Sequence, residues 1–174
     1  MRHRPLSAAA SQLLLLLLLR RPELVLSKTL SLDDDLFVSS SSSSETEPTE
    51  AAKAFDGDFG TTAELASPAP WLQASFDPSW RLTGYSFSVY EANPSFQTPT
   101  AWVASCEKGE IGNTTWVEID RRTDETLSTG AYYTEFSFAA NHTPGCTNVR
   151  FDFLGHDDED SPVYLVDVLL KAEW

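Results

Sequence analysis

Short segments in which apolar and polar residues alternate recur along the chain from residue 71 onward. An alternation with a period of two is typical of a β-strand that buries one face. Clusters of proline, glycine, asparagine and serine separate these segments, and no long stretch has helical periodicity. The pattern predicts an all-β fold, an antiparallel β-sandwich. The residues expected on the apolar faces are Leu72, Ala74, Phe76, Tyr85, Phe87, Val89, Trp102, Ala104, Cys106, Val117, Ile119, Phe136, Phe138, Val149, Phe151 and Phe153.

The last predicted strand, residues 163–170, differs from the others because it is apolar on both faces. Its single exception is the carboxylate of Asp167. A carboxylate in such a strand is costly to bury unless it meets a cation or several hydrogen-bond donors. Asp167 is therefore a candidate metal ligand.

A second group of candidate metal ligands lies in residues 54–62, whose sequence is AFDGDFGTT. Carboxylate, hydroxyl and carbonyl oxygens are the ligands that Ca²⁺ prefers, and glycine allows a loop to fold tightly. The candidates are Asp56, Asp58 and Thr61, which would share a calcium ion with Asp167. The alternative is that Asp56 only caps a turn through its own backbone.

The N-terminal residues 1–27 have the pattern of a secretory signal peptide. Arg2 and Arg4 precede a mostly apolar run over residues 8–19, which is shorter than the roughly 20 residues needed to span a bilayer. The alternative is a short membrane anchor. We expect an acidic lead-in over residues 28–36 and one domain over residues 37–174. The serine run near the start of this domain is either a flexible linker or the end of a first edge strand.

Two further features favour a secreted, extracellular glycoprotein. Asn113 and Asn141 each begin an N-x-S/T sequence that permits N-glycosylation. The chain has two cysteines, Cys106 and Cys146, and an even count in an exported protein indicates a disulfide bond. The alternative is a pair of buried free thiols.

The composition excludes some classes of partner. The chain has 174 residues, a length that is enough for one domain with a sizeable core. Its formal net charge is −14. Such a charge argues against nucleic acid, whose phosphates need basic patches, and against docking on anionic membranes. It is compatible with binding of divalent cations.

Four groups of residues follow one another in an order that carries a family resemblance. The first is AFDGD at residues 54–58 with Thr61; the others are WLQASF at 71–76 with LTGY at 82–85, PTAWVAS at 99–105 with Gly109 and Trp116, and VRF at 149–151 with LVDV at 165–168. In this order they resemble the discoidin domain, also called the coagulation factor five/eight C-type or galactose-binding-like domain. Family 32 carbohydrate-binding modules are similar. The resemblance extends from about Phe37 to Leu170.

The resemblance implies a jelly-roll sandwich that binds ligands through loops at one end and holds a structural calcium ion. Asp56, Asp58 and Thr61 match the calcium loop of the family, and Asp167 stands where the family has a late glutamate. Two positions depart from the family pattern: residues 63–65 lack the usual tryptophan, and Ser75 replaces an aspartate.

Candidate ligand-binding residues lie in two predicted loops. Tyr90, Asn93, Phe96 and His156 combine aromatic rings with planar polar groups, which suit the apolar face and hydroxyl rim of a sugar. The alternative for each is a plain solvated loop. We expect a secreted module that binds a galactose-type glycan or another extracellular ligand. The second hypothesis is a cell-adhesion or structural protein that binds a protein partner and has no sugar site.

Enzymatic activity is not expected. The sequence contains no G-x-S-x-G, H-E-x-x-H or phosphate-binding loop motif. Asp157 and Asp158 offer a carboxylate pair of the kind that glycosidases use, but they belong to an acidic run typical of a solvated loop. We expect a non-catalytic protein.

Overall fold

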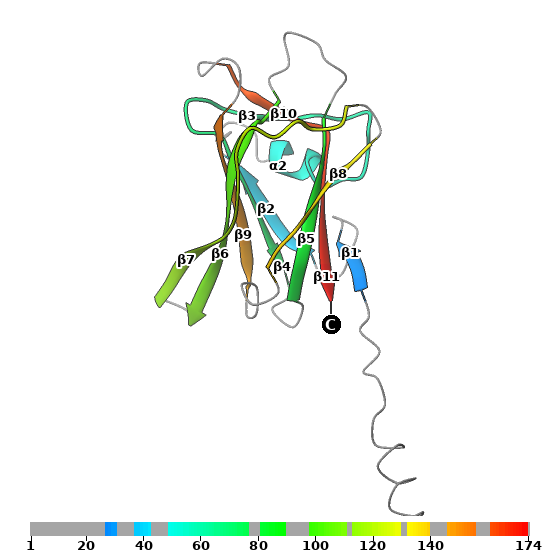
Figure 1. Ribbon diagram of the computed structural model, residues 1–174. Coiled ribbons are helices and arrows are strands. Elements are labelled where there is room, and N and C mark those ends of the chain that lie inside the picture. The colour runs from blue at the N-terminus through cyan, green and yellow to red at the C-terminus, as the bar shows by residue number, and fades with distance from the viewer. Residues whose placement is uncertain are drawn as a thin grey trace, which may run out of the picture.

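The computed structural model describes residues 27–30, 37–42, 49–76, 81–89, 98–110, 113–129, 132–139, 146–155 and 161–173. Two antiparallel sheets face each other and form a β-sandwich, as the alternation predicts (Figure 1). None of the helices in these ranges is long and apolar enough to cross a membrane.

The larger sheet has five strands in the order β2-β4-β9-β6-β7. Neighbouring strands are antiparallel throughout. The outermost strands are β2, which contains the first four residues of the serine run, and β7. The strands are β2 (Phe37–Ser42), β4 (Trp71–Phe76), β6 (Ala101–Glu110), β7 (Asn113–Arg122) and β9 (Asn148–Gly155).

The smaller sheet has four strands in the order β1-β11-β5-β8, and a two-stranded sheet joins β10 to β3. A five-residue helix, α2, lies at the same end of the sandwich as β3 and β10 (Figure 1). The elements are β1 (Ser27–Leu30), α2 (Thr49–Lys53), β3 (Ala63–Leu65), β5 (Arg81–Ser88), β8 (Thr134–Ser137), β10 (Val163–Leu165) and β11 (Asp167–Glu173).

The core between the sheets includes most of the residues that the alternation places on the apolar faces, together with others that it did not single out, such as Phe55 and Leu65. Tyr85 lies at its centre, with ring centroids 5.1 Å from Phe136 and 4.9 Å from Phe151. Trp102 is fully buried and contacts Phe87 across a centroid distance of 5.1 Å. Aromatic rings from both sheets thus meet at the centre of the core, and burial of apolar surface is the main favourable term in folding.

One residue of the expected core lies on the surface instead. Val117 is 41% exposed, whereas Ile119, two residues later, is 4% exposed. β7 is the outermost strand of its sheet, and β8, the outermost strand of the facing sheet, has only four residues. A register shift between β6 and β7 at Ala104 and Ser105 also interrupts the alternation at this point.

Two further differences concern the ends of the chain. The run over residues 163–170 is divided at Val166 into β10 and β11, which belong to different sheets. Residues 27–30, expected at the boundary of the signal peptide and the lead-in, form strand β1 and pair with β11. Backbone pairing of this kind leaves little trace in a short polar sequence.

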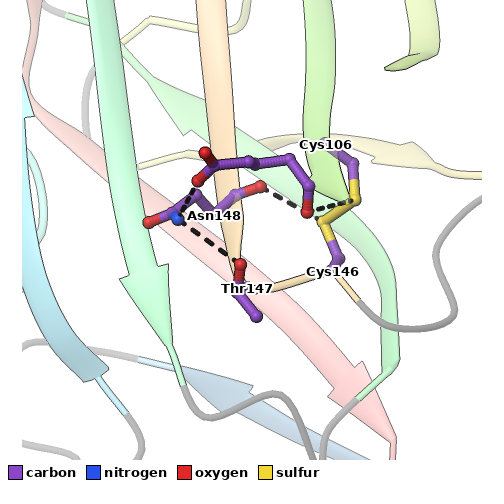
Figure 2. Close-up of a disulfide and its surroundings, with 5 residues drawn as sticks. Cys106, Cys146, Thr147 and Asn148 are labelled. Carbon is purple, nitrogen blue, oxygen red and sulfur yellow. Dashed lines mark hydrogen bonds between the residues drawn. A yellow bond between two sulfur atoms is a disulfide. The ribbon is translucent and has the colours of Figure 1, made fainter. Parts of the chain in front are cut away.

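A disulfide bond joins the two cysteines (Figure 2). Cys106 lies on β6, Cys146 precedes β9, and their Cα atoms are 5.6 Å apart. Both residues are fully buried. Beside them the side-chain amide of Asn148 donates a hydrogen bond to the carboxylate of Glu107. The disulfide bond ties the start of β9 to its neighbour β6.

Candidate functional site

Several connections gather at one end of the sandwich, which we call the loop end. Ser88 at the end of β5 is paired with Asp167 at the start of β11. Gly155 at the end of β9 is paired with Ala101 at the start of β6. Residues 123–129 join the two sheets here, because Glu125 donates to the carbonyl of Thr100 (2.9 Å) and residue 129 forms a bridge with residue 89.

The acidic loop, residues 56–61, lies at the loop end and is held by its own side chains. The two carboxylate oxygens of Asp56 accept hydrogen bonds from the backbone N–H of Asp58 and the hydroxyl of Thr61, both at 2.8 Å. Asp58 in turn accepts from the backbone N–H of Gly60 at 2.8 Å. Gly57 has a φ of 70°, a conformation that glycine adopts without strain. These contacts are those of a turn capped by aspartate.

Asp167 is fully buried and meets several donors. The Tyr133 hydroxyl donates to Oδ2, and the backbone N–H of Val168 donates to Oδ1 at 2.8 Å. A hydrogen bond from the backbone of Gly57 links Asp167 to the acidic loop. Burial raises the pKa of Asp167 above its ordinary value, and repulsion from Asp56 adds to this shift, while the three donors oppose it.

The donor set suits a hard cation in its chemistry. Asp56 and Asp167 come from distant parts of the chain and are close enough for their charges to interact. Thr61 adds a hydroxyl oxygen beside Asp56. Within the described ranges no three residues of the histidine, cysteine, aspartate and glutamate types cluster as a metal site. Calcium binding would therefore rely on two carboxylates completed by hydroxyl and backbone oxygens, and it stays a prediction.

Aromatic residues that the sequence analysis did not single out also lie at the loop end. Phe59, within the acidic loop, is 37% exposed and contacts the Tyr133 ring edge-on, with centroids 5.5 Å apart. The neighbouring Tyr132 is 73% exposed. The only sequence signal for Phe59 is its place between two glycine-containing turns, and nothing local connects Tyr133 with residues 59 and 167.

The ligand-binding residues predicted from the sequence, Tyr90, Asn93, Phe96 and His156, lie outside the described residues, as does Asn141. The strands that precede them, β5 and β9, both end at the loop end. Asn113 is the first residue of β7. The prediction that these residues bind a ligand or carry glycans is therefore untested.

A groove of about 490 Å³ lies elsewhere, along the side of the sandwich between the outer strands β7 and β8. Its rim includes Glu118 and Arg121, whose side chains form an ion pair at 2.6 Å. Ile119 and Phe138 supply buried apolar surface. The groove does not include the acidic loop or the other loop-end residues described above.

No protein-family model and no curated protein matches the sequence. Solved structures do match. The F5/8 type C domain of a protein from Bacteroides fragilis superposes with a TM-score of 0.62 at 20% identity, covering 78% of this chain and 95% of that one. The chain has a discoidin-type fold. The discoidin-like domain predicted from the four groups of residues is thereby confirmed at the level of the fold.

Two carbohydrate-binding modules are also similar to this discoidin-like domain. Chitosan-binding module 1 of a chitosanase/glucanase from Paenibacillus sp. IK-5 has a TM-score of 0.53 at 14% identity, covering 84% of this chain and 93% of that one. The family 32 module of NanJ from C. perfringens, solved with galactose, has a TM-score of 0.50 at 12% identity, covering 83% and 93%.

Proposed function

We propose that this discoidin-like domain is a non-catalytic carbohydrate-binding module that uses its loop end. The observation that carries the proposal is the convergence of the acidic loop, the exposed aromatic ring of Phe59 and the ends of β5 and β9 at this end. Sugar sites combine aromatic surface with fixed polar groups, and both are present here. Similar folds that bind galactose and chitosan support the assignment.

The finer proposal concerns the ligand and the location of the protein. We infer that the ligand is a galactose-type glycan, contacted by Tyr90, Asn93, Phe96 and His156 in the loops that follow β5 and β9. The signal-like residues 1–27, the two glycosylation sequences and the disulfide bond favour a secreted protein. An extracellular protein is the alternative partner.

A glycan array probed with the purified chain tests the proposed function. The array carries galactose-terminated glycans, N-acetylgalactosamine-terminated glycans and chitosan oligosaccharides, and hits are measured again by calorimetry. We expect saturable binding to galactose-terminated glycans. Binding to chitosan oligosaccharides alone would keep the carbohydrate-binding module and reject the galactose-type ligand. Uniformly blank spots would reject both and favour the protein-binding alternative.

We further propose that calcium stabilises the loop end. When bound, the ion would cross-link the acidic loop to the start of β11 without taking part in any reaction. Its ligands would be the carboxylates of Asp56 and Asp167, completed by the hydroxyl of Thr61 and the backbone oxygen of Asp58. A ligand that binds the native state alone raises stability by mass action. We expect the melting temperature to rise with calcium relative to chelator, and to lose this rise in Asp56→Ala but not in the control Glu135→Ala. An identical melting temperature in both buffers would leave Asp56 as a turn cap.

A further inference from the structure

A continuous chain of side-chain contacts runs from the buried interior to the surface of the loop end. The carboxylate of Asp167, fully buried at the start of β11, accepts a hydrogen bond from the Tyr133 hydroxyl. The Tyr133 ring then contacts the Phe59 ring edge-on, at 5.5 Å and an interplanar angle of 62°. The exposed ring of Phe59 is therefore held by residues from two other segments that are far away in the sequence.

A smaller exposed fraction and the ring contact with Tyr133 distinguish Phe59 from the other exposed aromatic residue nearby. Tyr132 is 73% exposed, and Phe59 is 37% exposed. A ring that is largely surrounded by solvent must be ordered when a ligand binds, and this ordering reduces affinity. A ring already held by its neighbours offers the same apolar surface with less loss of freedom. Preorganisation therefore favours Phe59 over Tyr132 as a contact for a ligand.

We propose that Phe59 is a stacking surface for a pyranose ring and that Tyr133 is its positioning residue. This inference rests on the proposed carbohydrate-binding function and names a contact in that site. A pyranose ring stacks well when one face carries an unbroken patch of C–H groups. Galactose has such a face, because its axial 4-hydroxyl points to the other side and leaves the hydrogens of C3, C4 and C5 together.

The neighbouring residues supply the polar part of the contact. Asp58 precedes Phe59 directly and is exposed, and its carboxylate is oriented by the hydrogen bond from the Gly60 backbone at 2.8 Å. Carboxylate oxygens accept hydrogen bonds from sugar hydroxyls. An apolar ring beside an oriented carboxylate matches the apolar face and the hydroxyl rim of one sugar residue.

The test measures galactose binding by calorimetry in the original chain and in four variants. We expect Phe59→Ala to weaken binding by about tenfold or more, since the stacking contact is lost. Phe59→Trp should retain binding, because its larger ring offers the same kind of surface. Tyr133→Phe keeps the ring and loses the hydroxyl, and we expect it to weaken binding severalfold. The matched control Tyr132→Ala should stay within about twofold of the original chain.

The double variant Phe59→Ala with Tyr133→Phe separates positioning from a merely structural role. If Tyr133 acts through Phe59, then Tyr133→Phe has no further effect on binding once Phe59 is absent. Equal effects of Tyr133→Phe with and without Phe59 would overturn the positioning role. Unchanged binding in Phe59→Ala, with loss in Tyr132→Ala, would overturn the stacking contact. If the original chain binds neither galactose nor any glycan on the array, the proposed function itself fails, and this inference fails with it.

Discussion

The residue with the most demanding environment in the core is Tyr85. Its hydroxyl accepts a hydrogen bond from Trp102 Nε1 and donates one to the carboxylate of Asp120, each at 2.7 Å. Arg122 Nε donates to the same carboxylate at 2.8 Å, so the buried phenol is connected to charged groups at the sheet edge. Because a buried polar group is costly without partners, this network determines how the aromatic core is arranged.

The first prediction concerns the loss of this hydroxyl. Tyr85→Phe should lower the free energy of unfolding by about 1–3 kcal/mol, because Trp102 and Asp120 each lose a buried partner. Denaturant titration followed by tryptophan fluorescence measures the change. Tyr132→Phe is the control, since the 73% exposed Tyr132 should contribute little. Equal stability of the Tyr85 variant and the original chain would contradict the network.

The same variant predicts a change in pH dependence. Burial and the hydrogen bond to Asp120 raise the pKa of Tyr85 above its ordinary value of 10.0. The folded chain therefore keeps this proton at a pH where the unfolded chain releases it, so the contribution of Tyr85 is present below about pH 10 and is lost as the pH rises further. Above about pH 10, the stability of Tyr85→Phe should fall less steeply than that of the original chain. If the stabilities of the two chains fell in parallel above this pH, the fold would not raise the pKa of Tyr85.

At the scale of the element, β5 combines a position that requires glycine with one that tolerates change. A Cβ atom at Gly84 would lie 2.3 Å from the backbone oxygen of Phe136 on β8. Two residues later, Ser86 is 1% exposed and its hydroxyl has no hydrogen-bond partner among the described residues. The close approach of β8 to β5 thus depends on the absence of a side chain at Gly84. The buried hydroxyl of Ser86 adds no hydrogen bond to this strand pair.

We predict opposite effects for two substitutions on this strand. Gly84→Ala should destabilise the domain by about 3 kcal/mol or more, because the backbones of β5 and β8 must separate. Ser86→Ala should raise the stability by about 1 kcal/mol, since it removes an unpaired buried hydroxyl. Thermal and urea unfolding of the two variants tests both signs. A Gly84→Ala variant as stable as the original chain would mean that the strands can shift at little cost.

The alternation of apolar and polar residues predicted the strands that have one face packed against the core. It was correct for β9, where Val149, Phe151 and Phe153 are buried in alternation. It was correct only in part for β5, where Tyr85 and Phe87 are buried but so are Ser86 and Ser88 between and after them. It failed at Val117, which lies on an outer strand next to a register shift between β6 and β7 that interrupts the alternation. It also missed β1, whose pairing with β11 uses backbone groups that every sequence has.

The candidate site was predictable only where its residues are close in the sequence. Asp56, Asp58 and Thr61 form one loop, and the loop residues themselves indicated hydrogen-bonding oxygens. The buried carboxylate of Asp167 was recognised as needing donors or a cation. Its principal side-chain donor, Tyr133, is 34 residues away, and the contact of Tyr133 with Phe59 depends on the fold of the whole sandwich.

At the scale of the whole molecule, the disulfide bond closes a long segment. Cys106 and Cys146 are separated by 40 residues, a segment that includes β7 and β8. In the chain-entropy model such a cross-link stabilises the native state by about 4 kcal/mol, mainly by restricting the unfolded chain. Replacing both cysteines by alanine should lower the free energy of unfolding by an amount in this range. Denaturation of the double variant, with the original chain under reducing conditions for comparison, measures it.

The direction of β11 has a practical consequence. The strand begins with Asp167 at the loop end and runs to Glu173 at the opposite end, where Figure 1 marks the C-terminus. A chain attached to a sensor surface or a bead through a C-terminal tag would therefore point its loops toward the solution. Random coupling through lysine side chains imposes no such orientation. Captured by its C-terminus, every molecule on the surface would present the same end to a multivalent glycan, so neighbouring copies could engage it together.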